Sequence, residues 1–158
     1  MTMKAMLLIC LFAFVPAAAQ ACDEVALGEL TVTDAWSRAT IGADRPGIFY
    51  VEIRNVGVRD DALLGLSTPA ASMPMLHETV VKDGLATMPH AAAVPIPAGG
   101  VVRLAPGGFH GMLMGLTAPL TEGGSFPVTL TFREAGEVTV ETQVQSIRSM
   151  AAECVGGR

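Results

Sequence analysis

Apolar and polar residues alternate along most of this chain, which is the pattern of half-buried β-strands. In residues 48–54 every second position is apolar, from Phe49 to Ile53, and the positions between are mostly polar. Residues 126–132 and 138–144 alternate in the same way. Because successive side chains of a strand point to opposite faces of a sheet, each segment is predicted to be a strand with one buried face.

Short glycine-containing segments separate the predicted strands. Short strands divided this often by turns are typical of an antiparallel β-sandwich or β-barrel. Residues 30–147 contain no linker-like interruption and no internal repeat, and 158 residues suffice for one domain. We therefore predict a single all-β domain at residues 22–148 and a C-terminal tail at 149–158. The turn segments are 55–57, 98–100, 106–108, 122–124 and 135–136.

The first 21 residues have the features of a secretory signal peptide. Lys4 supplies a positive charge, residues 6–15 are all apolar, and small residues follow up to Ala21. The apolar run is too short for a permanent membrane-spanning helix. We therefore expect residues 1–21 to be removed, leaving a periplasmic protein with no transmembrane segment.

The cysteines of the mature chain would be Cys22 and Cys154, close to its two ends. In an oxidising compartment they could form a disulfide, which would contribute roughly 4–5 kcal/mol by closing so long a loop. Alternatively, Cys22 could carry a lipid anchor, although the leucine that usually stands three positions earlier is missing. Cys154 could also bind a metal.

The charge of the chain restricts its partners. Ten basic and fifteen acidic residues give a net charge of −5, and removal of Lys4 changes this to −6. There is no cluster of basic residues, so nucleic acids and anionic membrane surfaces are poor candidates.

Histidine and methionine residues carry the only evident chemistry. His77, Met88, His110 and Met112 follow the spacing His-x10-Met-x21-His-x-Met. Two imidazoles and two thioethers form a soft, neutral donor set, which suits Cu(I) better than Zn²⁺, Ca²⁺ or Mg²⁺. Methionine is also a common core residue, so the same pattern is compatible with ordinary packing.

Strand periodicity places a histidine and a methionine on a common face in three short segments. Gly111 would let another part of the chain or a ligand approach closely. Met75 and Met114 could form a thioether rim that captures or hands over copper, or could simply pack. His90 could replace a ligand or could be a solvated histidine. The pairs are Met75 with His77, Met88 with His90, and His110 with Met112.

Four motifs resemble those of the PCuAC (DUF461) family of periplasmic copper chaperones. Residues 35–38 are similar to its Ala-Trp-x-Arg motif, and residues 50–55 to its Tyr-x4-Asn segment. Residues 106–112 resemble its Pro-Gly-Gly-aromatic-His-x-Met signature, and residues 130–138 its closing hairpin. The resemblance covers about residues 30–147.

This resemblance implies a cupredoxin-like Greek-key β-barrel that binds Cu(I) at an exposed edge through His77, Met88, His110 and Met112. It also implies delivery of copper to the CuA centre of cytochrome c oxidase subunit II, often together with a Sco-type protein. Glu78 stands where some relatives have methionine. The tail lacks a His/Met-rich extension, so no second copper site is expected there, and we expect a monomer.

Other functions fit the sequence less well. A blue-copper electron carrier needs a cysteine beside two histidines, and both cysteines lie far from them. A copper storage or resistance protein would have the same site, and a metal-free β-sandwich interaction module would have none. No catalytic grouping is evident, so we predict that the chain is not an enzyme. Trp36 and Arg38 should stabilise the barrel, and Arg38 could pair with Glu52.

Overall fold

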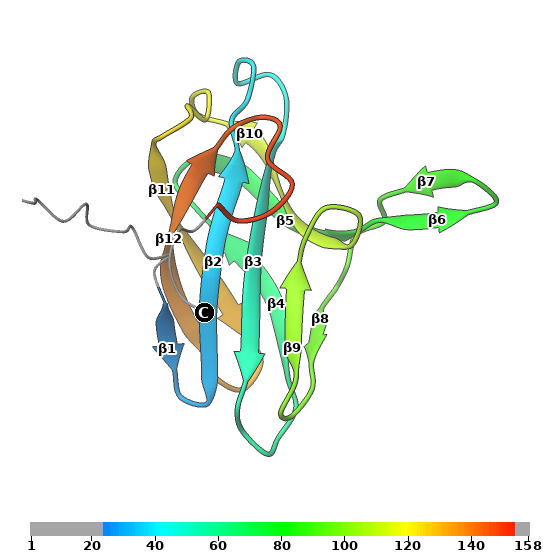
Figure 1. The fold of residues 1–158 in the computed structure, drawn as a ribbon, viewed down its shortest axis with the longest axis vertical. Coiled ribbons are helices and arrows are strands. Elements are labelled where there is room, and N and C mark those ends of the chain that lie inside the picture. The colour runs from blue at the N-terminus through cyan, green and yellow to red at the C-terminus, as the bar shows by residue number, and fades with distance from the viewer. Residues whose placement is uncertain (1–23, 154–158) are drawn as a thin grey trace, which may run out of the picture.

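The computed structural model describes residues 24–153, and within this range it contains twelve β-strands and no helix (Figure 1). The predicted signal segment, Cys22 and Cys154 lie outside the described residues. The strands are β1 (Val25–Leu27), β2 (Leu30–Arg38), β3 (Gly47–Asn55), β4 (Asp61–Ser67), β5 (Ala71–Glu78), β6 (Val80–Lys82), β7 (Leu85–Thr87), β8 (Val94–Ile96), β9 (Val101–Leu104), β10 (Phe109–Leu116), β11 (Ser125–Phe132) and β12 (Glu137–Gln145).

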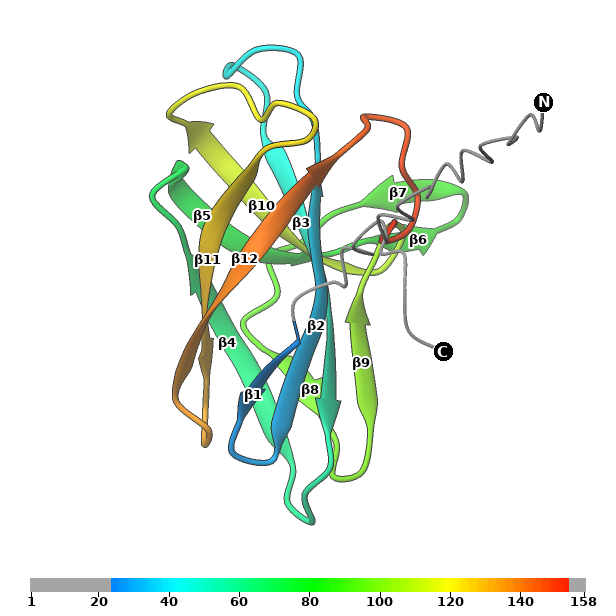
Figure 2. The same ribbon diagram turned by 60° about the vertical axis from the view of Figure 1, so that its left-hand side comes forward.

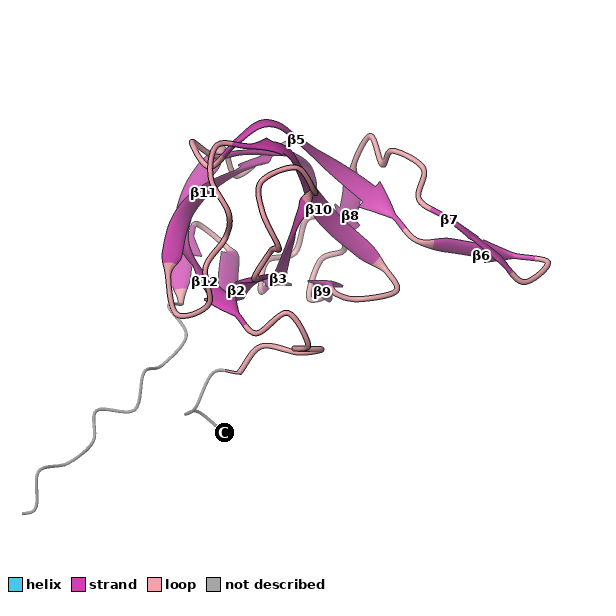
Figure 3. Ribbon diagram, turned by 90° about the horizontal axis from the view of Figure 1, so that it is seen from above, coloured by secondary structure: helices cyan, strands magenta, loops and turns pink. Residues whose placement is uncertain are grey.

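Ten of these strands form one sheet that curls around a central core, as Figure 3 shows from above. Its main path is β5-β10-β3-β2-β12-β11-β4-β8, with β1 beside β2 and β9 beside β3. β12 lies between β2 and β11 (Figure 2). Its pairing with β2 is parallel, whereas the other pairings are antiparallel, so the predicted antiparallel arrangement has one exception. The all-β prediction is confirmed.

β6 and β7 form a separate two-stranded hairpin that projects from the curled sheet (Figures 1 and 3). All of its residues are exposed, including Val81 and Leu85, each at 68%. The hairpin therefore contributes nothing to the core.

The core is built from the alternate apolar positions that the sequence indicates. Phe49, Val51 and Ile53 of β3 are at most 1% exposed, as are Val128 and Leu130 of β11. Burial of each such side chain contributes roughly 1.5–3 kcal/mol, so these strands hold the sheet in its curled form.

Tyr50 departs from the simple alternation, because it is buried although it points away from the core positions of β3. Its ring lies 4.5 Å from that of Trp36, and the Arg38 guanidinium lies 5.8 Å above it. Burial raises the pKa of the Tyr50 phenol, and the nearby positive charge of Arg38 opposes this increase. Trp36 and Arg38 thus support the sheet at this point.

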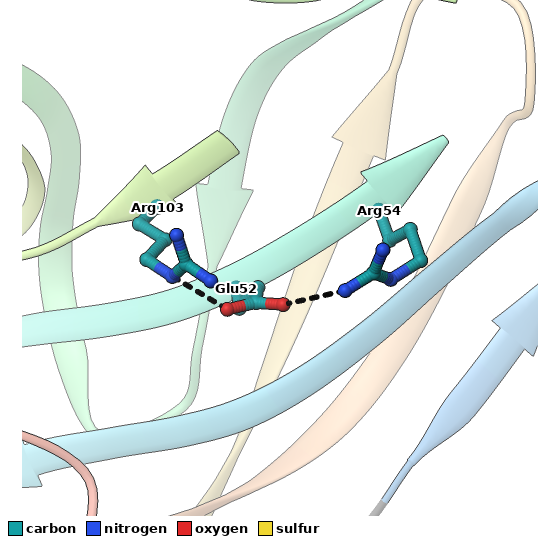
Figure 4. Close-up of polar contacts among 3 residues, drawn as sticks. All are labelled: Glu52, Arg54 and Arg103. Carbon is teal, nitrogen blue, oxygen red and sulfur yellow. Dashed lines mark hydrogen bonds and ion pairs between the residues drawn. The ribbon is translucent and has the colours of Figure 1, made fainter. Parts of the chain in front are cut away.

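The suggested Arg38–Glu52 pair does not form. Glu52 faces Arg103 across the β3–β9 pairing, and the Arg103 Nε to Glu52 Oε2 distance is 2.6 Å, with Arg54 at 3.5 Å on the other side (Figure 4). Arg38 lies farther along β2 and instead donates a 2.7 Å hydrogen bond to the carbonyl oxygen of Ser149. This bond holds part of the predicted tail, where Ser149 is buried.

The part of the chain that the structure describes has no helix long and apolar enough to cross a membrane.

Candidate metal centre

The strands β5 and β10 bring the two halves of the His/Met pattern together. His77 pairs directly with His110, and Met75 pairs with Met112. Cross-strand partners project to the same face with their Cβ atoms about 4.5–5.5 Å apart. The two imidazole centroids lie 6.0 Å apart with 28° between the ring planes. Residues separated by 33 positions in the chain are therefore neighbours on one surface.

Residues 88–91 follow the opposite edge of β5. The Ala91 amide donates to the Leu76 carbonyl at 2.8 Å, and the Glu78 amide donates to the Pro89 carbonyl at 3.1 Å. His90 forms a bridge with His77, and their ring centroids are 6.1 Å apart. The three histidines thus form one row across three neighbouring segments, with His77 in the middle.

In each histidine, Nδ1 is the ring nitrogen that faces the backbone carbonyl oxygen of another residue. Nδ1 of His77 lies 2.8 Å from the Met88 carbonyl oxygen, Nδ1 of His110 lies 3.0 Å from that of Gly108, and Nδ1 of His90 lies 3.1 Å from that of Leu76. A carbonyl oxygen only accepts hydrogen bonds, so Nδ1 must carry the proton. In the neutral ring this leaves the lone pair on Nε2, as in many histidines that bind metals.

Nε2 of His77 is buried and has no hydrogen-bond partner. Such a nitrogen ordinarily costs about 1–3 kcal/mol, because its hydration is lost and nothing replaces it. The only similar side-chain atom among residues 24–153 is Oγ1 of Thr142, which lies opposite Phe126 in an apolar part of the sheet. A metal ion bound to Nε2 would satisfy the His77 ring.

The surrounding donors restrict the kind of metal. Among the described residues, no three His, Cys, Asp or Glu side chains are placed to hold an ion. A centre here must therefore include thioethers, which soft ions accept and hard divalent ions do not. Met112 and Met75 are partly buried beside the histidine pair, whereas the Met88 side chain is 53% exposed. Met88 also acts through its carbonyl oxygen, which orients His77.

Two glycines, Gly107 and Gly111, shape the part of the site on β10. Gly107 adopts a φ of 85° in the turn before β10, and the next residue supplies the carbonyl that orients His110. At Gly111 an added Cβ would lie 2.9 Å from Leu66 Cδ1 and 3.1 Å from Phe49 Cβ. The close approach predicted at Gly111 is thus to core side chains on the inner face, and no room remains for a larger residue.

The structure brings His77, His110 and Met112 onto one two-stranded surface and leaves Met88 at its edge. Sequence reasoning missed Met73, which pairs with Met114 on the same strands, although its two-residue spacing from Met75 was available as a signal. Binding of a metal by Cys154 lies outside the described residues.

This curled sheet with its row of histidines and methionines defines a PCuAC domain, a cupredoxin-like β-structure. The copper-bound PCuAC domain from PmoF2 is similar with a TM-score of 0.68 and 26% identity, over 78% of this chain and 98% of that one. The solution structure of CuI-DR1885 from Deinococcus radiodurans gives a TM-score of 0.62 and 30% identity, over 85% and 89%.

The family model described as "Putative lipoprotein LpqE-like" matches residues 30–144, and the chain belongs to this family. A relative from Leifsonia xyli subsp. xyli, named "Putative lipoprotein Lxx21020", is 40% identical over 131 residues, which is 82% of this chain and 77% of the relative. The fold and family predictions are therefore confirmed.

Proposed function

We propose that this protein is a copper chaperone that binds one Cu(I) through His77, His110, Met112 and Met88. The observation that carries this proposal is the buried, unpartnered Nε2 of His77, which lies in a cross-strand pair with a second histidine of the same tautomer. The names of the copper-bound PmoF2 domain and of CuI-DR1885 support the choice of copper.

The donor set fits transport of Cu(I) better than permanent storage. Cu(I) accepts ligands without strong geometric demands, and neutral imidazoles and thioethers hold it without a thiolate that could oxidise. The exposed Met88 side chain can leave the ion first, so that copper can pass to another protein by exchange of one ligand at a time.

The acceptor that we propose is the CuA centre of cytochrome c oxidase subunit II, reached directly or through a Sco-type protein. A blue-copper electron carrier is less consistent with the structure, because residues 24–153 contain no cysteine to supply the thiolate. Copper storage would use the same ligands, so transfer of copper to an acceptor separates the two functions. Transfer of Cu(I) from the loaded protein to apo-subunit II would support delivery, and retention would support storage.

We also propose that the protein is exported and held at the membrane surface by a lipid on Cys22. The two lipoprotein names among its relatives support this fate for Cys22 over a disulfide with Cys154. Metabolic labelling with a fatty acid tests it, because Cys22→Ser would abolish the label if the lipid is attached there.

The binding experiment is competition of the protein against a Cu(I) chelator under reducing conditions. Alanine at His110 or Met112 should weaken Cu(I) binding at least about tenfold, because each removes one of the proposed ligands on β10. Met88→Ala should have a smaller effect, since its backbone carbonyl remains. Met150→Ala is the matched control, because it removes a thioether outside β5 and β10. Tight binding that survives substitution of each proposed ligand would contradict the assignment.

A further inference from the structure

The paired donors on β5 and β10 continue beyond the proposed site. Next to the His77–His110 pair lies Met75 opposite Met112, and the following pair is Met73 opposite Met114. All of these positions are two residues apart on their strands, so the side chains project from the same face of the sheet. Four thioethers therefore extend from the histidines in a cross-strand ladder.

These methionines are not required to fill the core. Met73 is 52% exposed, and Met75, Met112 and Met114 are only partly buried. The opposite face of the same strands does the packing, through Leu76 at 2% and Leu113 at 0% exposure. A row of partly exposed thioethers beside two histidines needs another explanation.

We propose that Met73, Met75 and Met114 form a second Cu(I) position beside the His/Met site; this rests on the proposed function for the identity of the metal. Cross-strand methionines have Cβ atoms about 5 Å apart, and their unbranched side chains can turn both sulfur atoms toward one ion. Met75 lies within diagonal reach of Met114 and can supply a third sulfur.

The second position binds Cu(I) more weakly than the first, because it has no imidazole and is open to water. An ion held there lies one pair away from Met112 and two pairs away from the histidines. Copper can therefore move along the ladder by replacing one thioether with the next, without any change in its oxidation state. Met75 pairs with Met112 and lies diagonally from Met114, so it forms the link.

The test uses the folded mature protein with methionine methyl groups labelled with ¹³C, titrated with Ag(I) as a closed-shell stand-in for Cu(I). The first equivalent should shift the methyl signals of Met112 and Met88. The second should shift those of Met73, Met114 and Met75. In the double variant M73L/M114L the response of the Met75 signal to the second equivalent should be lost and the first set of shifts retained, because leucine conserves volume but cannot coordinate.

Met150→Leu is the control and should leave both steps unchanged. If the Met73 and Met114 signals stay fixed after the first equivalent, or move only together with that of Met150, the second position does not exist. If Met112 fails to respond to the first equivalent, the proposed function itself is wrong. The two failures are thus separable in one titration.

Discussion

Two groups of buried polar atoms in this molecule differ in their hydrogen bonding. At the end of β3, Asn55 donates from Nδ2 to the Arg59 carbonyl at 2.8 Å and accepts from the Gly57 amide at 2.9 Å. Close to it, the carboxylate of Asp61 accepts from three backbone amides. In the histidine row, Nε2 of His77 is buried and has no partner at all.

The difference distinguishes a structural role from a binding role. The bonds of Asp61 reach the amides of Glu134 and Ala135, so they fasten the start of β4 to the turn between β11 and β12. Both carboxylate oxygens of Asp61 already accept hydrogen bonds from the backbone. His77 keeps its lone pair free at a cost in stability, which a bound ligand would offset.

The largest effect is expected at Asp61, whose two carboxylate oxygens are engaged in hydrogen bonds within the fold. Asp61→Ala removes three hydrogen bonds to a carboxylate, one of them buried and two partly buried, so the free energy of unfolding should fall by about 3 kcal/mol. Urea unfolding monitored by fluorescence of the single Trp36 measures it. The affinity of the folded protein for Cu(I) should be unchanged. A parallel loss of affinity would show that Asp61 does not have a purely structural role.

The reverse outcome is expected at His77, whose Nε2 has no hydrogen-bond partner. His77→Leu should reduce Cu(I) affinity about 100-fold, a loss of roughly 2.7 kcal/mol in binding. The free energy of unfolding should change by less than about 1 kcal/mol, because the variant removes an unpartnered buried nitrogen and the exposed Met88 carbonyl can bond to water. Chelator competition and urea unfolding on the same sample give both numbers. A large loss of stability with copper affinity intact would assign His77 a structural role.

Gly111→Ala should affect stability and binding together, since this residue lies in the core and between two proposed ligands. Contacts of the new Cβ with Leu66 and Phe49 should cost about 1–3 kcal/mol in unfolding free energy. The same displacement of β10 should weaken Cu(I) binding by shifting His110 and Met112. Gly65→Ala is the control, because a Cβ there meets nothing within 4 Å. Equal behaviour of the two variants would show that the close packing has no role.

The smallest effect concerns Tyr50, whose buried ring lies against that of Trp36. Its pKa is raised above the ordinary 10.0, so the folded protein keeps the phenol proton at a pH where the unfolded chain loses it. This contribution to stability is complete below pH 10 and declines as the pH rises from there toward the folded-state pKa. Tyr50→Phe should remove that decline in unfolding free energy. An identical alkaline profile in both proteins would contradict the raised pKa.

Much of the fold could be predicted from the sequence, because alternation and turns are local signals. Residues 48–54 became part of β3, and the turn at 106–108 precedes β10. The parallel pairing of β12 with β2 could not be predicted, since it joins segments from the two ends of the domain. Tyr50 looked exposed by alternation, but Trp36 covers it.

The candidate site was only partly predictable for the same reason. Two-residue spacing places His110 and Met112 on one face, but it does not show that His77 is the direct partner of His110. The role of Asp61 was hidden as well, because its amide partners lie 73 and 74 positions later in the chain. The free lone pair of His77 depends on a carbonyl that becomes its neighbour only after folding.

The hairpin of β6 and β7 begins after His77 and ends just before Met88, and two hydrogen bonds close its base. They join Nδ1 of His77 to the Met88 carbonyl and the Glu78 amide to the Pro89 carbonyl. Everything beyond this base is solvent-exposed and absent from the core. The hairpin can therefore be lengthened, shortened or given other charges without altering the proposed copper ligands at its base.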